Sequence, residues 1–188
     1  MERLYWNNDW KFAETWEEAM KEAVYPENEM EDVRLPHTCK ELPYHYFDEH
    51  AYQMLCGYRR HFMAPEAWRG KSVELTFEGV AHDAVVYVNG TEVKAHHCGY
   101  TAFFVELAKY LKYGEDNVLA VRVDSRENLN IPPFGSSGRL FDFTAREVVT
   151  WPTKKISSRS ANERRANRDR SPRRAALRPA RHAAASAA

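Results

Sequence analysis

One short run restricts the fold more than any other part of the chain. Residues 71–79, KSVELTFEG, alternate apolar and polar side chains without a break, so that Val73, Leu75 and Phe77 share one side. Because successive side chains of a β-strand point to opposite faces, this pattern predicts a strand with one buried and one hydrated face. Such a strand needs neighbouring strands and a core to cover its apolar face.

The next apolar run ends at a strong turn signal. Residues 83–89, DAVVYVN, are mostly apolar, which is typical of a strand that is buried on both faces. The run ends at Asn89-Gly90, and this dipeptide favours a two-residue hairpin turn, because a type I′ turn requires a positive φ at both central residues. We therefore expect residues 91–95 to be the second strand of a hairpin.

Three further runs have the length and composition of short strands, namely residues 58–64, 100–107 and 117–124. Several short strands separated by turn residues indicate an antiparallel sandwich or barrel. Before them, Trp16, Met20 and Val24 lie at helical spacing, so residues 13–24 are expected to form a short amphipathic helix. Residues 25–57, rich in Pro, His and Tyr, are expected to form long surface loops.

The formal net charge of zero is a cancellation between two unlike parts. Residues 1–135 hold 14 Lys and Arg against 23 Asp and Glu, whereas residues 136–188 hold 13 against 4. Residues 154–188 contain one Ile and one Leu but no Val, Phe, Tyr, Trp or Met, which predicts disorder. We therefore expect a domain at residues 1–135 and a basic, low-complexity tail at residues 136–188.

Several classes of protein are excluded by what the sequence lacks. No run of 18 apolar residues predicts a membrane span, and the N-terminus has no apolar signal-peptide core. The three cysteines are sparse and form no close ligand pairs, which favours reduced cytoplasmic thiols and predicts no metal and no cofactor. The basic tail lacks aromatic residues for base stacking, so no specific nucleic-acid partner is expected.

Five segments follow one another in a distinctive order along the chain. They are RLPHTC at 34–39, GYRRHF at 57–62, VELTFEGVAHDAVVYVNGTEV at 73–93, HHCGYTAFFVEL at 96–107 and NVLAVRVDSRENLNIPPFG at 117–135. Together they resemble the N-terminal sugar-binding domain of glycoside hydrolase family 2, which includes β-galactosidases, β-glucuronidases and β-mannosidases. The resemblance covers about residues 5–135 and implies a galactose-binding-like jelly-roll β-sandwich, in an all-β fold. In the family this domain precedes an immunoglobulin-like domain and a catalytic (β/α)-barrel.

The resemblance implies an accessory domain without catalytic residues of its own. Retaining hydrolysis of a β-glycoside needs two carboxyl groups about 5 Å apart, and in the family both are glutamates of the barrel. The carboxylates around Glu27 and Glu29 are expected to form a solvated acidic loop instead. The expected partners are a carbohydrate (β-galactoside, β-glucuronide or β-mannoside) and the downstream domains of the parent enzyme, which hydrolyses β-glycosides with retention.

Four residues are candidates for contact with a sugar. Arg59 could bind a carboxylated sugar or form structural salt bridges, and both alternatives stay open at this point. His97 and Tyr100 flank Gly99 in an expected loop, where imidazole and aromatic groups can line a sugar cleft or pack the loop. Asn130 could contact sugar or brace the approach to the IPPFG segment.

The chain departs from the family pattern after residue 135. Family members typically continue with V-I-D-Y-L-T-Y-G-G-I-Y-R, whose Asp helps to hold the sugar, and Arg139 occupies that position here. If residues 139–142 were encoded as CGA-TTA-TTT-GAC before a T, reading one base later would give Asp-Tyr-Leu-Thr. A frameshift after about residue 135 is therefore one hypothesis.

Three interpretations follow from the resemblance and this departure. The chain is a truncated accessory fragment of a glycosidase, a stand-alone carbohydrate-binding module, or a non-functional pseudogene product. In the third case a strand missing after Gly135 would expose a sheet edge and core side chains.

Overall fold

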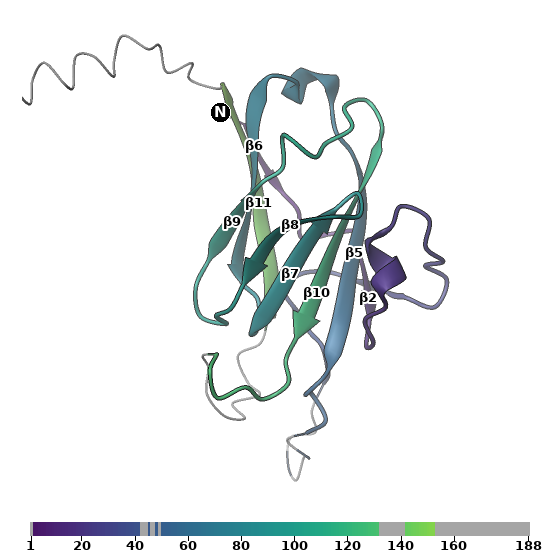
Figure 1. Ribbon diagram of the computed structural model, residues 1–188, viewed down its shortest axis with the longest axis vertical. Helices are drawn as coiled ribbons and strands as arrows, with labels where there is room; N and C mark the ends of the chain where they lie inside the picture. Colours follow the sequence, from purple (N-terminus) through teal and green to yellow (C-terminus); the bar gives the residue numbers. More distant parts are fainter. Residues whose placement is uncertain (1, 42–44, 46–47, 49, 132–141, 153–188) are drawn as a thin grey trace, which may run out of the picture. The chain divides into compact units, whose positions relative to one another are not determined.

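The computed structural model of the protein describes residues 2–41, 45, 48, 50–131 and 142–152. Within these residues the regular structure is almost entirely β-strand, in two antiparallel sheets that face each other across a common core (Figure 1). The all-β sandwich expected from the strand pattern is thereby confirmed.

The larger sheet has six strands in the order β3-β2-β5-β10-β7-β8. Its central strands β5 and β10 pair along their whole length, from Asp116 opposite Met63 to Asp124 opposite Leu55. The strands are β2 (Trp10–Ala13), β3 (Glu31–Val33), β5 (Leu55–Met63), β7 (Asp83–Val88), β8 (Thr91–His96) and β10 (Asp116–Asp124).

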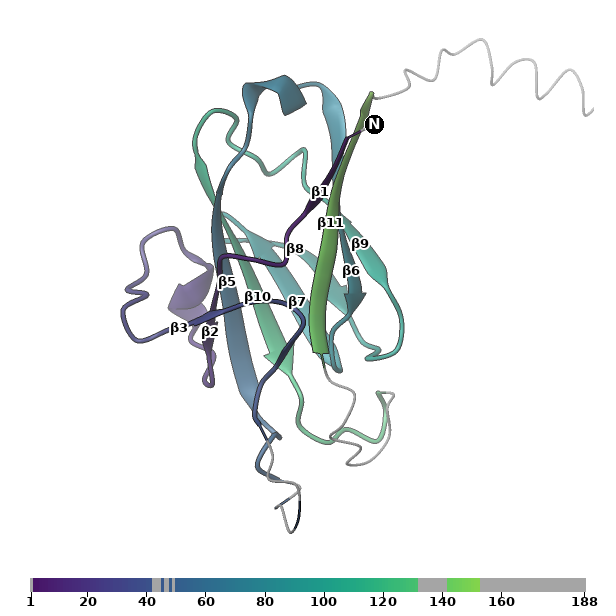
Figure 2. The same cartoon turned by 180° about the vertical axis from the view of Figure 1, so that it is seen from behind.

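The second sheet has five strands in the order β1-β11-β6-β9, with β4 pairing only with β11 (Figure 2). Two short 3-10 helices, η1 (Glu18–Lys21) and η2 (Glu66–Trp68), interrupt the connections. The strands are β1 (Glu2–Tyr5), β4 (His37–Thr38), β6 (Lys71–Gly79), β9 (Phe103–Glu106) and β11 (Asp142–Pro152).

The alternating run at residues 71–79 is the strand β6, as predicted. Val73, Leu75 and Phe77 are completely buried in the core between the sheets, whereas Glu74, Thr76 and Glu78 lie on the outer face. At about 25 cal/mol per Å² of apolar surface, each such side chain contributes about 1.5–3 kcal/mol through burial. The period of two in the sequence therefore fixes which face of β6 meets the core.

The strand β7 is buried on both faces, which confirms the second prediction and gives its cause. Val86 and Val88 belong to the core between the sheets, whereas Val85 and Tyr87 pack under Trp16 in a separate cluster. The Trp16 and Tyr87 rings are stacked with centroids 5.6 Å apart. A segment outside the sandwich therefore covers the outer face of the larger sheet.

The predicted hairpin turn joins β7 to β8. Asn89 and Gly90 have φ values of 50° and 83°, the two positive values that a type I′ turn requires. The Asn89 side chain also donates from Nδ2 to Asn117 Oδ1 and accepts at Oδ1 from the Val118 amide, which ties the turn to β10.

The helix expected at residues 13–24 is absent from the described chain. Within residues 13–24 only the four residues of η1 are helical, and Val24 is 94% exposed although it belongs to the expected apolar stripe. Trp16 and Met20 are buried because they pack on Gly57, where an added Cβ would lie 2.6 Å from Met20 Sδ. Packing against the sheet, rather than helical periodicity, explains their spacing.

The expectation of long surface loops at residues 25–57 is wrong in part. This stretch contains β3, β4 and the start of β5, and it buries Met30, Leu35 and Tyr52. The short strands escaped the sequence analysis because three residues or fewer give no measurable alternation.

The strand β11 lies beyond residue 135, where the sequence predicts the end of the domain. It pairs with β6 from Thr144 opposite Gly79 to Pro152 opposite Lys71, and with β1 on its other side. Residues 1–153 form one compact unit. Residues 142–152 thus supply a strand between β1 and β6.

Residues 154–188, for which disorder is predicted, lie outside the described residues, as does Arg139. No helix within the described part is both long enough and apolar enough to cross a membrane.

Candidate functional site

Two aspartates meet at one end of the larger sheet. Asp83 is the first residue of β7, Asp124 is the last of β10, and the antiparallel register places them directly opposite each other. Beside them lies a cavity of about 310 Å³, here called the loop-end cavity. Its lining consists of His82, Asp83, Asp124, Arg126, Glu127, Asn128 and Ile131.

Each of the two carboxylates is held by a basic side chain. His97 Nδ1 lies 2.9 Å from Asp83 Oδ1. Arg126 donates to both oxygens of Asp124, from Nε over 2.9 Å and from Nη2 over 2.6 Å. Such a two-point contact fixes the direction in which the carboxylate presents its free lone pairs.

The pKa of Asp124 lies below its ordinary value. Burial alone would raise this pKa, but the hydrogen bonds from Arg126, together with the charges of Arg126 and Arg122, outweigh burial. Asp124 is therefore ionised at neutral pH and acts as a hydrogen-bond acceptor rather than as a proton donor.

Hydrogen bonds join the loops around this cavity to one another. The buried His82 places Nε2 2.6 Å from the carbonyl oxygen of Arg126, and its amide donates to the carbonyl of Asp124. Ser125 Oγ donates to the carbonyl of Tyr52 over 2.6 Å. Three loops that are distant in sequence are thus joined by hydrogen bonds beside the loop-end cavity.

The structure brings two of the four candidate residues to this cavity. His97 is exposed and reaches the lining through Asp83. Asn130 is also exposed, and its amide donates to Asn128 Oδ1 over 2.9 Å, within the loop that lines the cavity. Tyr100 is 60% exposed and is not among the lining residues.

Arg59 lies away from the loop-end cavity and forms contacts within the protein. Its side chain is fully buried, and its guanidinium donates to Glu27 Oε1 over 2.7 Å and to the carbonyl of Glu22 over 2.8 Å. It also donates to the carbonyl of Met20 and lies over the Tyr25 ring, 5.3 Å from the centroid. The structure therefore places Arg59 in contacts within the protein and away from the loop-end cavity.

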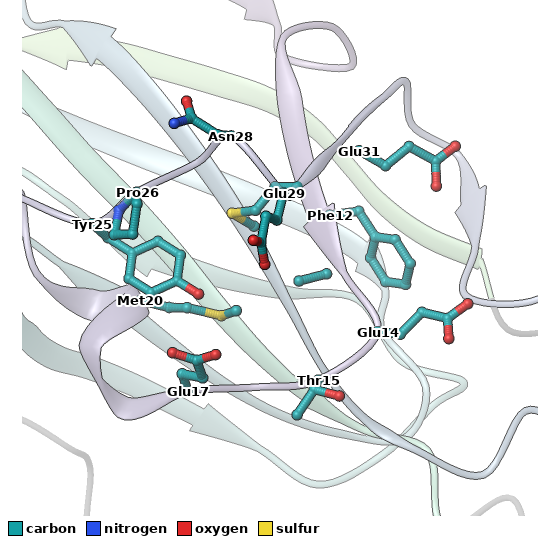
Figure 3. Close-up of a pocket in the computed structure, with 12 residues that line it drawn as sticks. Phe12, Glu14, Thr15, Glu17, Met20, Tyr25, Pro26, Asn28, Glu29 and Glu31 are labelled. Atoms are coloured by element: carbon teal, nitrogen blue, oxygen red, sulfur yellow. The ribbon is translucent and has the colours of Figure 1, made fainter.

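A larger cavity, of about 540 Å³, lies between β2, η1 and β3 (Figure 3). We call it the glutamate cavity because four of its lining residues are glutamates. No lining residue that the structure describes is basic. Its lining consists of Phe12, Ala13, Glu14, Thr15, Glu17, Met20, Tyr25, Pro26, Asn28, Glu29, Met30 and Glu31.

Tyr25 lies at one side of the glutamate cavity (Figure 3). Its ring lies over Met20, and the carboxylates of Glu17 and Glu29 both turn toward it, whereas Glu14 and Glu31 point away (Figure 3). Burial raises the pKa of the Tyr25 hydroxyl, and the charge and hydrogen bond of Glu17 raise it further. The phenol therefore stays neutral and donates to Glu17.

Sequence reasoning did not find either cavity. For the loop-end cavity the available signal was an Asp at the start of one strand and another at the end of its neighbour. For the glutamate cavity the available signal was the presence of Met20, Tyr25 and Met30 among the glutamates of residues 14–31. Within the described residues, no group of three or more potential ligands is placed to hold a metal ion.

Residues 41–131 match the family model described as glycosyl hydrolases family 2, sugar binding domain. The chain carries a family 2 sugar-binding domain. The match covers the strands that build the loop-end cavity, whereas the glutamate cavity is formed by residues 12–31, which lie outside it.

Curated relatives carry the same domain in much longer proteins. A β-galactosidase of Thermoanaerobacter pseudethanolicus is 44% identical over 142 residues, covering 74% of this chain and 19% of that protein. A β-galactosidase of Thermoanaerobacterium thermosulfurigenes is 41% identical, covering 69% and 18%, and a β-glucuronidase of Formosa agariphila is 30% identical, covering 63% and 13%. The chain thus spans less than a fifth of their length.

Solved structures share the fold of the family 2 domain. Bacteroides uniformis β-glucuronidase 2, covalently bound to cyclophellitol-6-carboxylate aziridine, superposes with a TM-score of 0.70 at 25% identity, covering 80% of this chain and 18% of that one. Because 80% of 188 residues is about 150, the likeness extends past residue 135, in agreement with the place of β11 in the sandwich.

Proposed function

We propose that the loop-end cavity binds a neutral β-galactoside and that the chain is the sugar-binding part of a retaining β-galactosidase. The observation that carries the proposal is the pair of carboxylates, Asp83 and Asp124, held at the cavity by His97 and Arg126. Two similar relatives, 44% and 41% identical, are β-galactosidases.

The charges of the cavity favour a neutral sugar over a glucuronide. Three acidic side chains, Asp83, Asp124 and Glu127, line it against a single arginine, Arg126, which is already engaged with Asp124. A sugar carboxylate would meet repulsion and find no free guanidinium. Sugar hydroxyls, in contrast, can donate to the carboxylates and accept from the Asn128 amide group, while Ile131 offers an apolar contact.

The chemical step is assigned to other parts of a longer parent. A retaining glycosidase needs a general acid whose pKa is raised, and the pKa of Asp124 is lowered. Within such a parent the domain orients the sugar, since its acceptors are fixed before the ligand arrives and cost little ordering entropy.

The test is calorimetric titration of the chain with methyl β-galactoside, methyl β-glucuronide and methyl β-mannoside. The galactoside is expected to bind with a Kd of about 1–10 mM, and the glucuronide at least about tenfold more weakly. Asp83→Asn should weaken the galactoside several-fold, whereas Glu92→Gln, an exposed change on β8, should not.

Two results would contradict the proposal. One is equal or tighter binding of the glucuronide, which would remove the charge argument. The other is no binding of any of the three glycosides by a folded chain, which would also exclude a stand-alone carbohydrate-binding module. Turnover of nitrophenyl β-galactoside by the chain alone would overturn the assignment of catalysis to other domains.

A further inference from the structure

One buried histidine contacts the turn that carries Asp124. His82 directly precedes Asp83 in the chain, is 5% exposed and belongs to the lining of the loop-end cavity. Its amide donates to the carbonyl of Asp124 over 3.3 Å, and its ring lies against the carbonyl of Arg126. This one residue therefore connects the start of β7 with the turn that follows β10.

The contact between His82 and Arg126 has a defined donor. Nε2 of His82 lies 2.6 Å from the carbonyl oxygen of Arg126. Because a carbonyl oxygen can only accept a hydrogen bond, the ring nitrogen that faces it carries the hydrogen and donates. The bond is partly buried, so that water competes with it less than with a contact on the surface.

The contact between Arg126 and Asp124 orients the carboxylate only as well as Arg126 itself is placed. Arg126 donates to Asp124 from its amide, from Nε and from Nη2, over 3.1, 2.9 and 2.6 Å. The Arg126 side chain is 59% exposed, however, and exposed ion pairs are screened by water and salt. All three donors belong to one residue, so their position depends on what holds the Arg126 backbone.

The backbone of this turn is held from two sides. On one side, Ser125 Oγ donates to the carbonyl of Tyr52 over 2.6 Å, in the segment that leads to β5. On the other side, His82 holds the carbonyl of Arg126 from the segment that leads to β7. Because Asp83 follows His82 directly in the chain, the second contact bears on how the two carboxylates of the cavity face each other.

We propose that His82 is a positioning residue of the sugar site. Through the carbonyl of Arg126 it holds Arg126, and with it the Asp124 carboxylate, in the geometry that accepts sugar hydroxyls. The inference rests on the proposed function, because it takes the loop-end cavity as the galactoside site. Without the His82 ring the Arg126 backbone loses an anchor, and the ligand must then order the carboxylate, which lowers affinity.

Two substitutions separate the hydrogen bond of His82 from the rest of its ring. The amide nitrogen of glutamine reaches about as far from the backbone as Nε2 of histidine, whereas that of asparagine reaches only about as far as Nδ1. His82→Gln therefore keeps a donor for the Arg126 carbonyl, and His82→Asn removes it.

The experiment titrates the ¹⁵N-labelled full chain with methyl β-galactoside and follows the amide chemical shifts, which suit millimolar affinities. His82→Gln should bind within about twofold of the wild-type chain, whereas His82→Asn should bind about five- to tenfold more weakly, as expected for the loss of one hydrogen bond. The melting temperature of each variant reports whether the fold is kept.

A histidine at the other end of the same sheet supplies the matched control. His61 Nδ1 lies 2.6 Å from Asp116 Oδ2, at the end of β10 remote from Asp124. His61→Asn removes a hydrogen bond of the same length, outside the lining of the loop-end cavity, and should leave galactoside affinity unchanged.

A double-mutant cycle distinguishes positioning from a general structural role. If His82 acts through Asp124, His82→Asn should weaken galactoside binding in the wild-type chain but by less than about twofold in an Asp124→Asn background. Equal losses in the two backgrounds would show that His82 does not act through this carboxylate, and would overturn the proposal.

The Nε–H group of Arg126 reports the same contact without any ligand. Because it donates to Asp124, it should be protected from exchange with water in the wild-type chain and in His82→Gln, and should exchange at least about tenfold faster in His82→Asn. An unprotected Arg126 Nε–H in the wild-type chain would overturn the proposal without any variant.

Two further results would overturn the proposal. One is wild-type affinity and exchange in a folded His82→Asn variant, and the other is a loss in His82→Gln equal to that in His82→Asn. If no galactoside binds to the folded wild-type chain, the proposed function fails, whereas the exchange measurement still decides whether His82 positions Arg126.

Discussion

The two cavities of the sandwich treat their acidic residues in opposite ways. In the loop-end cavity, Asp83 and Asp124 are each held by a hydrogen-bonding partner, His97 and Arg126 respectively, so that the geometry of both carboxylates is fixed. In the glutamate cavity, Glu29 points into an acidic space that lacks a described basic neighbour among its lining residues, and its four glutamates are exposed to solvent. The difference predicts a defined binding geometry in the first cavity and hydrated carboxylates in the second.

The largest expected effect is that of removing Arg59. Arg59→Leu leaves the Glu27 carboxylate and two backbone carbonyls without their partner, which should lower the free energy of unfolding by about 3–5 kcal/mol. Urea denaturation measures the loss.

A second arginine–glutamate pair provides the control for Arg59. Arg69 donates to both oxygens of Glu66, but both side chains are 62% exposed. Arg69→Leu should therefore lower the free energy of unfolding far less than Arg59→Leu does, because water screens an exposed ion pair. Equal losses from the two substitutions would contradict the structural role given to Arg59.

A smaller effect is expected where the η1 segment packs on the sheet. In Gly57→Ala the new Cβ would lie 2.6 Å from Met20 Sδ and 2.9 Å from Trp16 Cε3, so the segment must shift. Overpacking of this kind costs about 1–3 kcal/mol. Urea denaturation should show this loss, whereas galactoside affinity should stay the same, because the residues of this segment do not line the loop-end cavity.

The smallest effect is a pH dependence that separates the cavities. Because the pKa of Asp124 is lower in the folded protein than its ordinary value of 3.8, its contribution to stability is present above that pH and is lost as the pH falls through the folded value. The pKa of Tyr25 is raised above 10.0, so its contribution is present below that pH and is lost as the pH rises further.

Two conservative variants test these pH ranges. Asp124→Asn should differ from the parent protein above about pH 4 and converge with it in stronger acid. Tyr25→Phe should differ from the parent protein below about pH 10 and converge with it in stronger alkali. Thermal unfolding across pH measures both, and a difference between Tyr25→Phe and the parent that grows as the pH rises above about 10 would contradict the account.

The regular strands could be predicted from the sequence because their periodicity is local. The alternation of Val73, Leu75 and Phe77 determines one buried face, and Asn89-Gly90 determines the turn after β7, without knowledge of distant residues. The strand β11 was missed because its partners β1 and β6 lie far away in sequence and its own pattern is weak.

The sites were harder to predict because they depend on which distant residues meet. The guanidinium of Arg59 is a group that commonly binds a carboxylated ligand. Only the positions of Glu27 and of the carbonyls of residues 20 and 22 show that its donors are occupied. His97 was correctly placed in a loop, but its partner Asp83 lies across a hairpin. Tyr100 shares that loop and still lies outside the cavity lining.

The most direct test is to map amide chemical shifts of the ¹⁵N-labelled chain during titration with methyl β-galactoside. The account predicts that the shifts which change cluster at Asp83, Arg126, Asn128 and Asn130, while the amides of Glu17, Tyr25 and Glu29 stay unchanged. Changes centred on the glutamate cavity, or none at saturating galactoside in a folded chain, would contradict the claim that the loop-end cavity is the sugar site of this family 2 domain.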